Sequence, residues 1–104
     1  MIFLKSHQEI EIMRVANRIV SEILAELREN ICPGISTGEI DRISSELIRK
    51  KGARSAFKGY QIRNGTTPFP ATICISLNDE VVHGIPSGQR AVRNGDVVSL
   101  DFGV

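Results

Sequence analysis

An aspartate near the end of the chain lies in a run of apolar residues, where a charged side chain is unexpected. Asp101 follows Val98 and Leu100 and precedes Phe102. Burying a carboxylate in such surroundings is costly unless it is paired or bound to a metal ion, and carboxylate oxygens are suitable ligands for divalent cations. Asp101 can equally be exposed at the rim of a sheet, or accept hydrogen bonds from neighbouring amides. The strand alone leaves these interpretations open.

Two other side chains are of types that can do chemistry. His83 precedes Gly84 at the end of a predicted strand, and functional side chains are often displayed at such positions. A single histidine is still more often structural than catalytic. Cys74 alternates with Thr72 and Ser76 along another predicted strand. A cysteine there is by default a small buried residue, although this mildly polar strip can line a pocket as easily as it can pack under a helix.

Three aromatic residues and one short motif are further candidates for a functional site. Tyr60 and Phe69 bracket a loop rich in Gly and Pro, so with Phe57 they can form either a core or a pocket wall. Asp101-Phe-Gly103 also spells the D-F-G triplet of protein kinases. No Gly-rich loop, V-A-I-K lysine or H-R-D catalytic loop precedes it, and a kinase needs all of these. We interpret this triplet as a chance match.

Two predicted helices precede these residues. Ser6 and Glu9 have the spacing of a capping box, and apolar residues then recur at helical spacing up to about Asn30. Pro33-Gly34 ends that helix. A second capping-box pattern begins at Ser36, and its helix ends at Gly52. The expected apolar stripes are Ile10, Met13, Ala16, Val20, Ile23, Leu24 and Leu27 in the first helix, and Ile40, Ile43, Leu47 and Ile48 in the second.

After residue 53 the pattern changes to the two-residue period of strands. Residues 72–77 alternate between apolar and mildly polar side chains, a turn follows at Asn78-Asp79, and residues 80–83 form a further run that ends at Gly84. Residues 93–96 predict a second turn. It opens a last strand in which Val98, Leu100, Phe102 and Val104 share one face. Helices followed by strands predict an α+β fold.

Length, composition and charge exclude several classes of protein. A chain of 104 residues, 41% hydrophobic and 24% charged, suits one small folded domain. Thirteen basic against twelve acidic residues give no electrostatic reason to expect a nucleic-acid or membrane partner. The N-terminus lacks the apolar region of a signal peptide. Cys32 and Cys74 lack metal or disulfide spacing. We therefore expect a reduced, cytoplasmic protein.

Six segments of the chain recur in the same order, with compatible spacing, in one protein family. Over essentially its whole length the chain resembles the N-terminal portion of type I (bacterial-type) methionine aminopeptidases. The segments are Ser6–Val20 (SHQEIEIMRVANRIV), Cys32–Asp41 (CPGISTGEID), Ala56–Tyr60 (AFKGY), Phe69–Ser76 (FPATICIS), Glu80–Pro86 (EVVHGIP) and Gly95–Asp101 (GDVVSLD). The last two segments are the most discriminating.

The resemblance implies a fold, an activity and roles for five residues. The fold is the pita-bread (creatinase/aminopeptidase) fold, of which residues 1–104 would be the N-terminal half only. The activity is removal of the initiator methionine from nascent proteins when the next residue is small, with two divalent metal ions (Co, Mn, Fe or Zn) as cofactors. Asp101 matches a metal ligand and His83 a catalytic, substrate-contacting histidine. Tyr60, Phe69 and Cys74 match residues that line the methionine side-chain pocket.

Two departures from the family pattern leave alternatives open. The loop Gln61–Pro68 is several residues longer than in the family, and the remaining metal ligands and a second catalytic histidine would follow residue 104. We therefore expect this chain alone to bind no metal and to be inactive. The full-length enzyme would be monomeric. The alternatives are a non-catalytic half-domain that dimerises through its uncovered face, burying Val98, Leu100 and Phe102, and a metal-free binding relative of the same fold.

Overall fold

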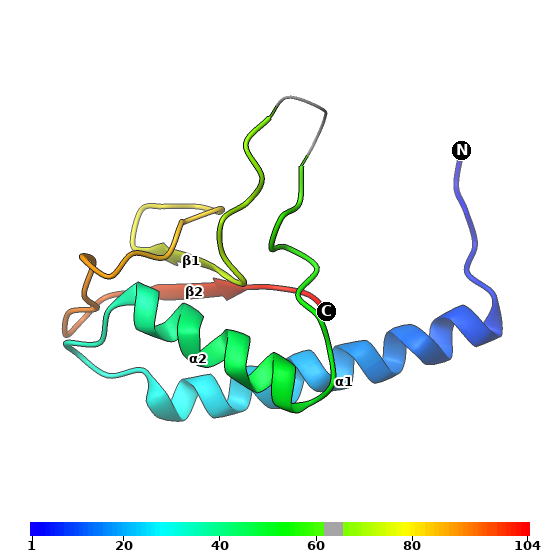
Figure 1. Cartoon of the computed structure of the whole chain (residues 1–104), viewed down its shortest axis with the longest axis horizontal. Helices are drawn as coiled ribbons and strands as arrows, with labels where there is room; N and C mark the ends of the chain where they lie inside the picture. Colours follow the sequence, from blue (N-terminus) through cyan, green and yellow to red (C-terminus); the bar gives the residue numbers. More distant parts are fainter. Residues whose placement is uncertain (62–65) are drawn as a thin grey trace.

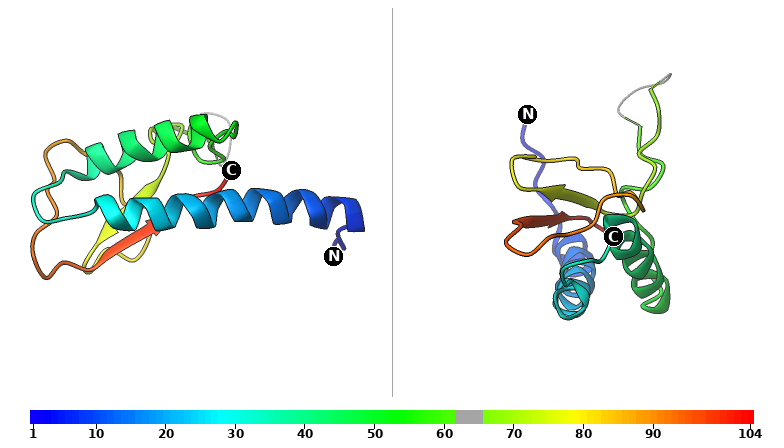
Figure 2. Two further views of the ribbon diagram at one scale, coloured as in Figure 1. Left: turned by 90° about the horizontal axis from the view of Figure 1, so that it is seen from below. Right: turned by 90° about the vertical axis from the view of Figure 1, so that its left-hand side faces the viewer.

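The computed structural model describes residues 1–61 and 66–104 of the chain. In those residues two helices, α1 (His7–Asn30) and α2 (Thr37–Lys50), precede a two-stranded antiparallel sheet of β1 (Cys74–Leu77) and β2 (Val98–Asp101). The helices lie side by side along one face of the sheet (Figures 1 and 2). This arrangement confirms the predicted α+β order.

Local capping signals place the ends of both helices. The Ser6 hydroxyl accepts the Glu9 amide at 3.1 Å while the Glu9 carboxylate accepts the Ser6 amide at 2.7 Å, so the predicted capping box of α1 is complete. In α2 only the serine half of the predicted box forms, because the Glu39 carboxylate binds Arg42 at 2.7 Å instead. Gly52, with φ of 71°, ends α2 as predicted.

The core lies between the two helices and the sheet. Its most deeply buried side chains come from the C-terminal half of α1, one face of α2, and β1 with the residue before it: Ile23, Leu27, Ile40, Ile48, Ile73 and Ile75. Phe102, which follows β2, is 8% exposed, and Val98 and Leu100 pack partly buried against the same cluster. Our expectation that these three residues form an uncovered face was therefore wrong, because the helices already cover them.

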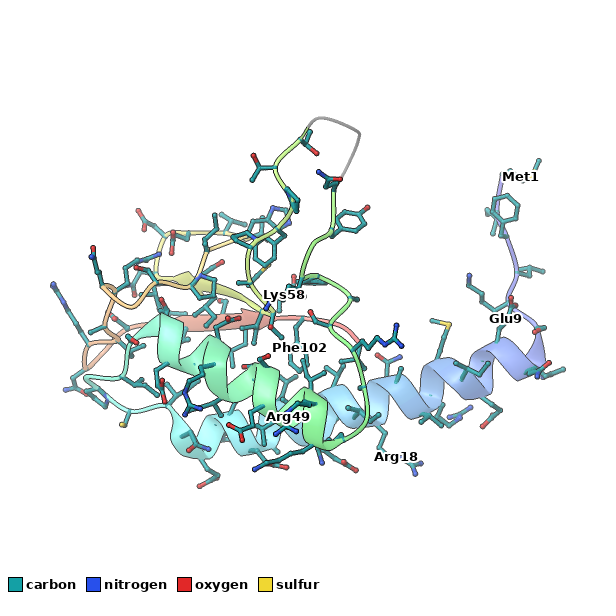
Figure 3. All side chains as sticks on the ribbon, viewed as in Figure 1. Met1, Glu9, Arg18, Arg49, Lys58 and Phe102 are labelled. Carbon is teal, nitrogen blue, oxygen red and sulfur yellow. The ribbon has the colours of Figure 1, made fainter. Side chains whose placement is uncertain are left out.

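The first half of α1 differs from the amphipathic pattern expected for it. Ile10 and Met13, both in the predicted apolar stripe, are 40% and 47% exposed, and Ile12 and Val15 are 64% and 61% exposed. This part of the helix extends beyond the sheet, and Met1 and Glu9, labelled in Figure 3, lie at its free end. The apolar spacing correctly predicted the helix, but only its C-terminal half reaches the core.

The strands show one further difference from the predicted pattern. All four residues of β1 are buried, so both of its faces are covered, whereas β2 alternates between partly buried and exposed residues. The predicted run at 80–83 is not a strand. Glu80 closes a turn by donating its amide to the Leu77 carbonyl at 3.0 Å, and the chain then loops back over β1. Neither helix in the described ranges is long and apolar enough to cross a membrane.

Candidate active site

An apolar pocket of about 510 Å³ lies beside the start of β1. Three segments form it: the loop on either side of residues 62–65, the first residue of β1, and the loop that follows β1. The lining residues are Phe57, Tyr60, Thr66, Thr67, Pro68, Phe69, Pro70, Cys74, His83 and Ile85. Four of the five residues singled out in the sequence, Tyr60, Phe69, Cys74 and His83, therefore meet around one cavity.

The aromatic wall of the pocket is anchored where the long loop begins and ends. The Gly59 amide donates to the Phe69 carbonyl and the Phe69 amide donates to the Tyr60 carbonyl, both at 2.9 Å. The rings of Phe57 and Phe69 meet edge to face, with centroids 6.3 Å apart. Part of the longer loop that departs from the family pattern, residues 62–65, lies outside the described residues. Phe69 keeps its place in the pocket because the paired ends of the loop hold it there.

Cys74 and Asp101 are neighbours across the sheet. They are register partners in the antiparallel pairing of β1 with β2. Burial raises the pKa of the Cys74 thiol, and the negative charge of Asp101 raises it further. The thiol therefore stays protonated at neutral pH, as befits a wall of the pocket and not a nucleophile. The Asp101 carboxylate is exposed on the outer face of β2, one strand away from the pocket.

His83 is displayed by an unusual backbone conformation. Its φ of 61° lies in the left-handed region, which residues with a Cβ atom seldom adopt. The next residue, Gly84, is buried against β1: its carbonyl accepts the Ile75 amide at 2.9 Å, and its amide donates to the Ser76 hydroxyl at 3.0 Å. A loop that is bonded to β1 at Gly84, and not a strand end, therefore presents His83 at the pocket.

An ion pair closes the base of this same loop. The Arg90 guanidinium binds Glu80 through both carboxylate oxygens, at 2.8 and 3.2 Å, and the Glu80 carboxylate also accepts the Leu77 amide at 2.9 Å. These hydrogen bonds, that of Arg90 above all, hold the pKa of Glu80 below its usual range. Further along, the Thr37 hydroxyl accepts the Ser87 amide at 2.9 Å, which ties the loop to the start of α2.

Six of the ten lining residues, among them Ile85 and Phe57, were not assigned to the pocket by the sequence reasoning. Ile85 lines the cavity but was noted only as part of the segment around His83, and Phe57 was left as either core or pocket. The aromatic and aliphatic lining residues come from segments that are distant along the chain, so the sequence does not show that they share a cavity. The nearest available signal was the position of Ile85 two residues after the candidate histidine.

The described residues do not form a metal site by themselves. No three of their His, Cys, Asp or Glu side chains gather closely enough to hold an ion. Asp101 is a single exposed carboxylate, and one carboxylate in water binds a divalent cation weakly compared with the multidentate sites that proteins use. Any metal bound with the help of Asp101 would need ligands from elsewhere.

Comparison with known proteins gives a consistent result. The model of metallopeptidase family M24 matches residues 11–104. A methionine aminopeptidase of Aquifex aeolicus is 46% identical over 100 residues, which are 96% of this chain and 39% of that protein. Methionine aminopeptidase 1 of Bacillus subtilis is 48% identical over 103 residues, 99% of this chain and 39% of the relative.

A solved structure agrees with the sequence comparisons. The crystal structure of a methionine aminopeptidase from Thermotoga maritima superposes on 98% of this chain with a TM-score of 0.87 and 35% identity, over 39% of its own length. The chain thus spans about 39% of the length of the curated relatives it matches. The resemblance to the N-terminal portion of bacterial methionine aminopeptidases, and the N-terminal half of the pita-bread fold, are confirmed.

Proposed function

Because the chain belongs to metallopeptidase family M24, we propose that the complete protein removes the initiator methionine from nascent polypeptides when the next residue is small. The similarity to proteins named methionine aminopeptidase supports this proposal. The proposed partners are the N-termini of newly made chains, which places the activity in the cytoplasm.

The observation that carries the proposal is the composition of the pocket beside His83. Its walls are largely apolar and include the rings of Tyr60 and Phe69 and the thiol of Cys74. A methionine side chain is unbranched and apolar, and its sulfur makes favourable contacts with aromatic rings. The pocket is therefore suited to a methionine side chain. We propose that His83 contacts the scissile amide there.

The metal requirement of the family concerns Asp101. We propose that Asp101 supplies one ligand to a pair of divalent ions (Co, Mn, Fe or Zn) in the complete protein, and that the other ligands come from outside residues 1–104. Such ions activate water and polarise a carbonyl. On its own, the 104-residue chain is proposed to hold neither ion, since its described residues offer no group of three ligands.

The proposal is tested by comparing the complete protein with the 104-residue chain. Release of methionine from a Met-Gly peptide is measured with added cobalt or manganese. We expect activity only from the complete protein. In that protein His83→Ala should lower turnover by roughly two to four orders of magnitude, the usual range for losing a proton-handling or oxyanion-stabilising group.

His7→Ala provides the matched control, because His7 is exposed at the start of α1 and lines no part of this pocket. Its turnover should equal that of the parent. Turnover of His83→Ala within a few-fold of the parent would show that His83 is structural.

A second candidate function has one observation in its favour. The exposed apolar side chains of the first half of α1, Ile12 and Val15 among them, would suit a non-catalytic half-domain that associates with another chain. Metal-dependent release of methionine by the complete protein would decide against this alternative.

A further inference from the structure

We infer that Ser76 is a positioning residue for His83, an inference that rests on the function proposed above. Ser76 belongs to β1, is 3% exposed, and accepts the Gly84 amide at 3.0 Å. That amide belongs to the peptide group that links His83 to Gly84. The hydroxyl of Ser76 therefore holds the peptide plane that follows His83 directly.

The hydrogen bond that Ser76 accepts is one of two that hold Gly84 against β1. The other runs from the Ile75 amide to the Gly84 carbonyl at 2.9 Å, so the peptide groups on both sides of the Gly84 Cα are bonded to consecutive residues of β1. The approach is so close that a Cβ atom on Gly84 would collide with the Ile75 carbonyl oxygen. The backbone of Gly84 thus packs directly on the backbone of β1, and the Ser76 side chain adds a hydrogen bond at the same place.

The left-handed backbone of His83 depends on such a constraint. A residue with a Cβ atom keeps this sparsely populated conformation only where its surroundings over-determine it. The remaining ties of the loop lie further away: Glu80 with Arg90 at its base, and Ser87 with Thr37 beyond Pro86. Together with the Ile75–Gly84 hydrogen bond they keep the loop in place, but none of them holds the His83–Gly84 peptide group, which can rotate once the bond to Ser76 is gone.

The consequence for the proposed reaction follows from where each group lies. Rotation of that peptide plane changes ψ of His83 and releases its left-handed backbone, so the His83 side chain would shift relative to the other residues that line the pocket. The aromatic wall around Tyr60 and Phe69 is held by its own hydrogen bonds and would keep its shape. Small misplacements of a reacting group are expensive in rate. Loss of the Ser76 hydroxyl should therefore lower kcat and leave KM nearly unchanged.

The experiment uses the complete protein with Ser76→Ala, Ser76→Thr and a matched control. Ser44→Ala removes another buried serine hydroxyl, which donates its hydrogen bond to the Ile40 carbonyl within α2 and not to the loop. We expect Ser76→Ala to lower kcat about ten- to hundredfold for a Met-Gly peptide, with KM within threefold of the parent. Ser76→Thr keeps the accepting oxygen and should restore most of kcat, and Ser44→Ala should keep the kcat of the parent.

Amide hydrogen exchange supplies a readout that does not depend on activity. In Ser76→Ala the amide of Gly84 should exchange at least tenfold faster than in the parent, while amides of the core strand such as Ile75 keep their protection. An unchanged Gly84 exchange rate, or an equal fall of kcat in Ser44→Ala, would overturn the positioning role.

The two proposals fail in distinguishable ways. An inactive parent protein would overturn the proposed function and this inference with it. An active parent whose kcat is the same in Ser76→Ala would overturn the inference alone.

Discussion

At the scale of single residues, the site depends on a glycine that no other residue can replace. Gly84 has an ordinary φ, so its requirement is not conformational. It arises because a side chain there would collide with the carbonyl oxygen of Ile75 and would lie 2.9 Å from the Ser76 Cα. Both are atoms of the buried strand and cannot move aside cheaply. The neighbouring His83 is displayed only because Gly84 lets the loop approach β1 so closely.

Gly84→Ala should destabilise the complete protein by about 1–3 kcal/mol or more, the range seen when extra atoms are forced into a packed site. The methyl group must displace either the loop or the strand. Chemical denaturation measures the change. Gly88→Ala, in the same loop, is the control, because a Cβ atom there meets nothing within 4 Å. Its stability should stay within about 0.5 kcal/mol of the parent. Equal effects of the two substitutions would contradict the steric argument.

At the scale of elements, a few side chains join the helices to the sheet by hydrogen-bonding to backbone groups. Asp41 on α2 is an example: its Oδ1 accepts the amides of Thr72 at 2.8 Å and of Ile73 at 3.1 Å. Both of those residues are buried, at 2% and 0% exposure, just before β1. Asp41 therefore supplies hydrogen bonds that the strand cannot obtain from a neighbour at that point, and it places the start of β1, where the pocket begins.

Asp41→Ala should lower the free energy of unfolding by about 2 kcal/mol, because two buried amides lose their acceptor. Asp41→Asn retains an oxygen at the same place and should cost clearly less. Thermal or chemical denaturation of both variants of the complete protein separates the cases. The interpretation would be wrong if asparagine were as destabilising as alanine.

The loop over β1 contains a pH-sensitive ion pair between Glu80 and Arg90. Its base is closed by Glu80, whose pKa is lowered by the Arg90 guanidinium and the Leu77 amide. A carboxylate with a lowered native pKa stabilises the fold above its unfolded pKa of about 4.3 and loses that contribution as pH falls through the native value. Glu80→Gln should therefore be less stable than the parent at pH 7, and the difference should shrink as pH falls below about 4.

Stability curves of parent and variant against pH test this expectation. Asp79→Asn removes the adjacent exposed carboxylate, for which no ion pair is found among the described residues, and should be as stable as the parent at pH 7. A gap between Glu80→Gln and the parent that stayed constant down to pH 2 would rule out the titration of Glu80 as its cause.

At the scale of the whole molecule, the chain is elongated because α1 is longer than the sheet it covers. Its largest extent is 44 Å against 23 Å for the smallest, and a helix of 24 residues is about 36 Å long. The half that extends beyond the sheet carries exposed apolar side chains, as does the segment before it. The most exposed of these are Met1, Ile2, Phe3, Leu4, Ile12 and Val15. This apolar end is an uncovered surface, whereas the strand face that we first expected packs against the core.

The isolated 104-residue chain should therefore associate through the first half of α1. Sedimentation equilibrium should show dimers or larger species, and the double variant Ile12→Lys with Val15→Lys should shift them towards monomer. Ser21→Lys with Ala25→Lys adds the same two charges to exposed positions further along the helix and should leave the association unchanged. A parent chain that stayed monomeric at high concentration would contradict the prediction.

The sequence by itself determined the local features of the fold. The starts of α1 and α2 and the turn at Arg93–Asp96 are set by side chains acting on backbone groups a few residues away. Such interactions are present in the sequence pattern, so they could be predicted. The family resemblance gave roles to Tyr60, Phe69, Cys74 and His83, which the structure brings together at one pocket. Their individual roles stay predictions.

Only the tertiary structure decided which surfaces are buried and how the site is displayed. Periodicity could not tell which half of α1 reaches the core, because both halves carry apolar residues at helical spacing. It predicted a strand at 80–83, where the bonds of Gly84 to Ile75 and Ser76 instead produce a loop with His83 in a left-handed conformation. These outcomes depend on contacts between segments distant along the chain, whose burial and hydrogen bonding outweigh the weak local preferences of the residues involved.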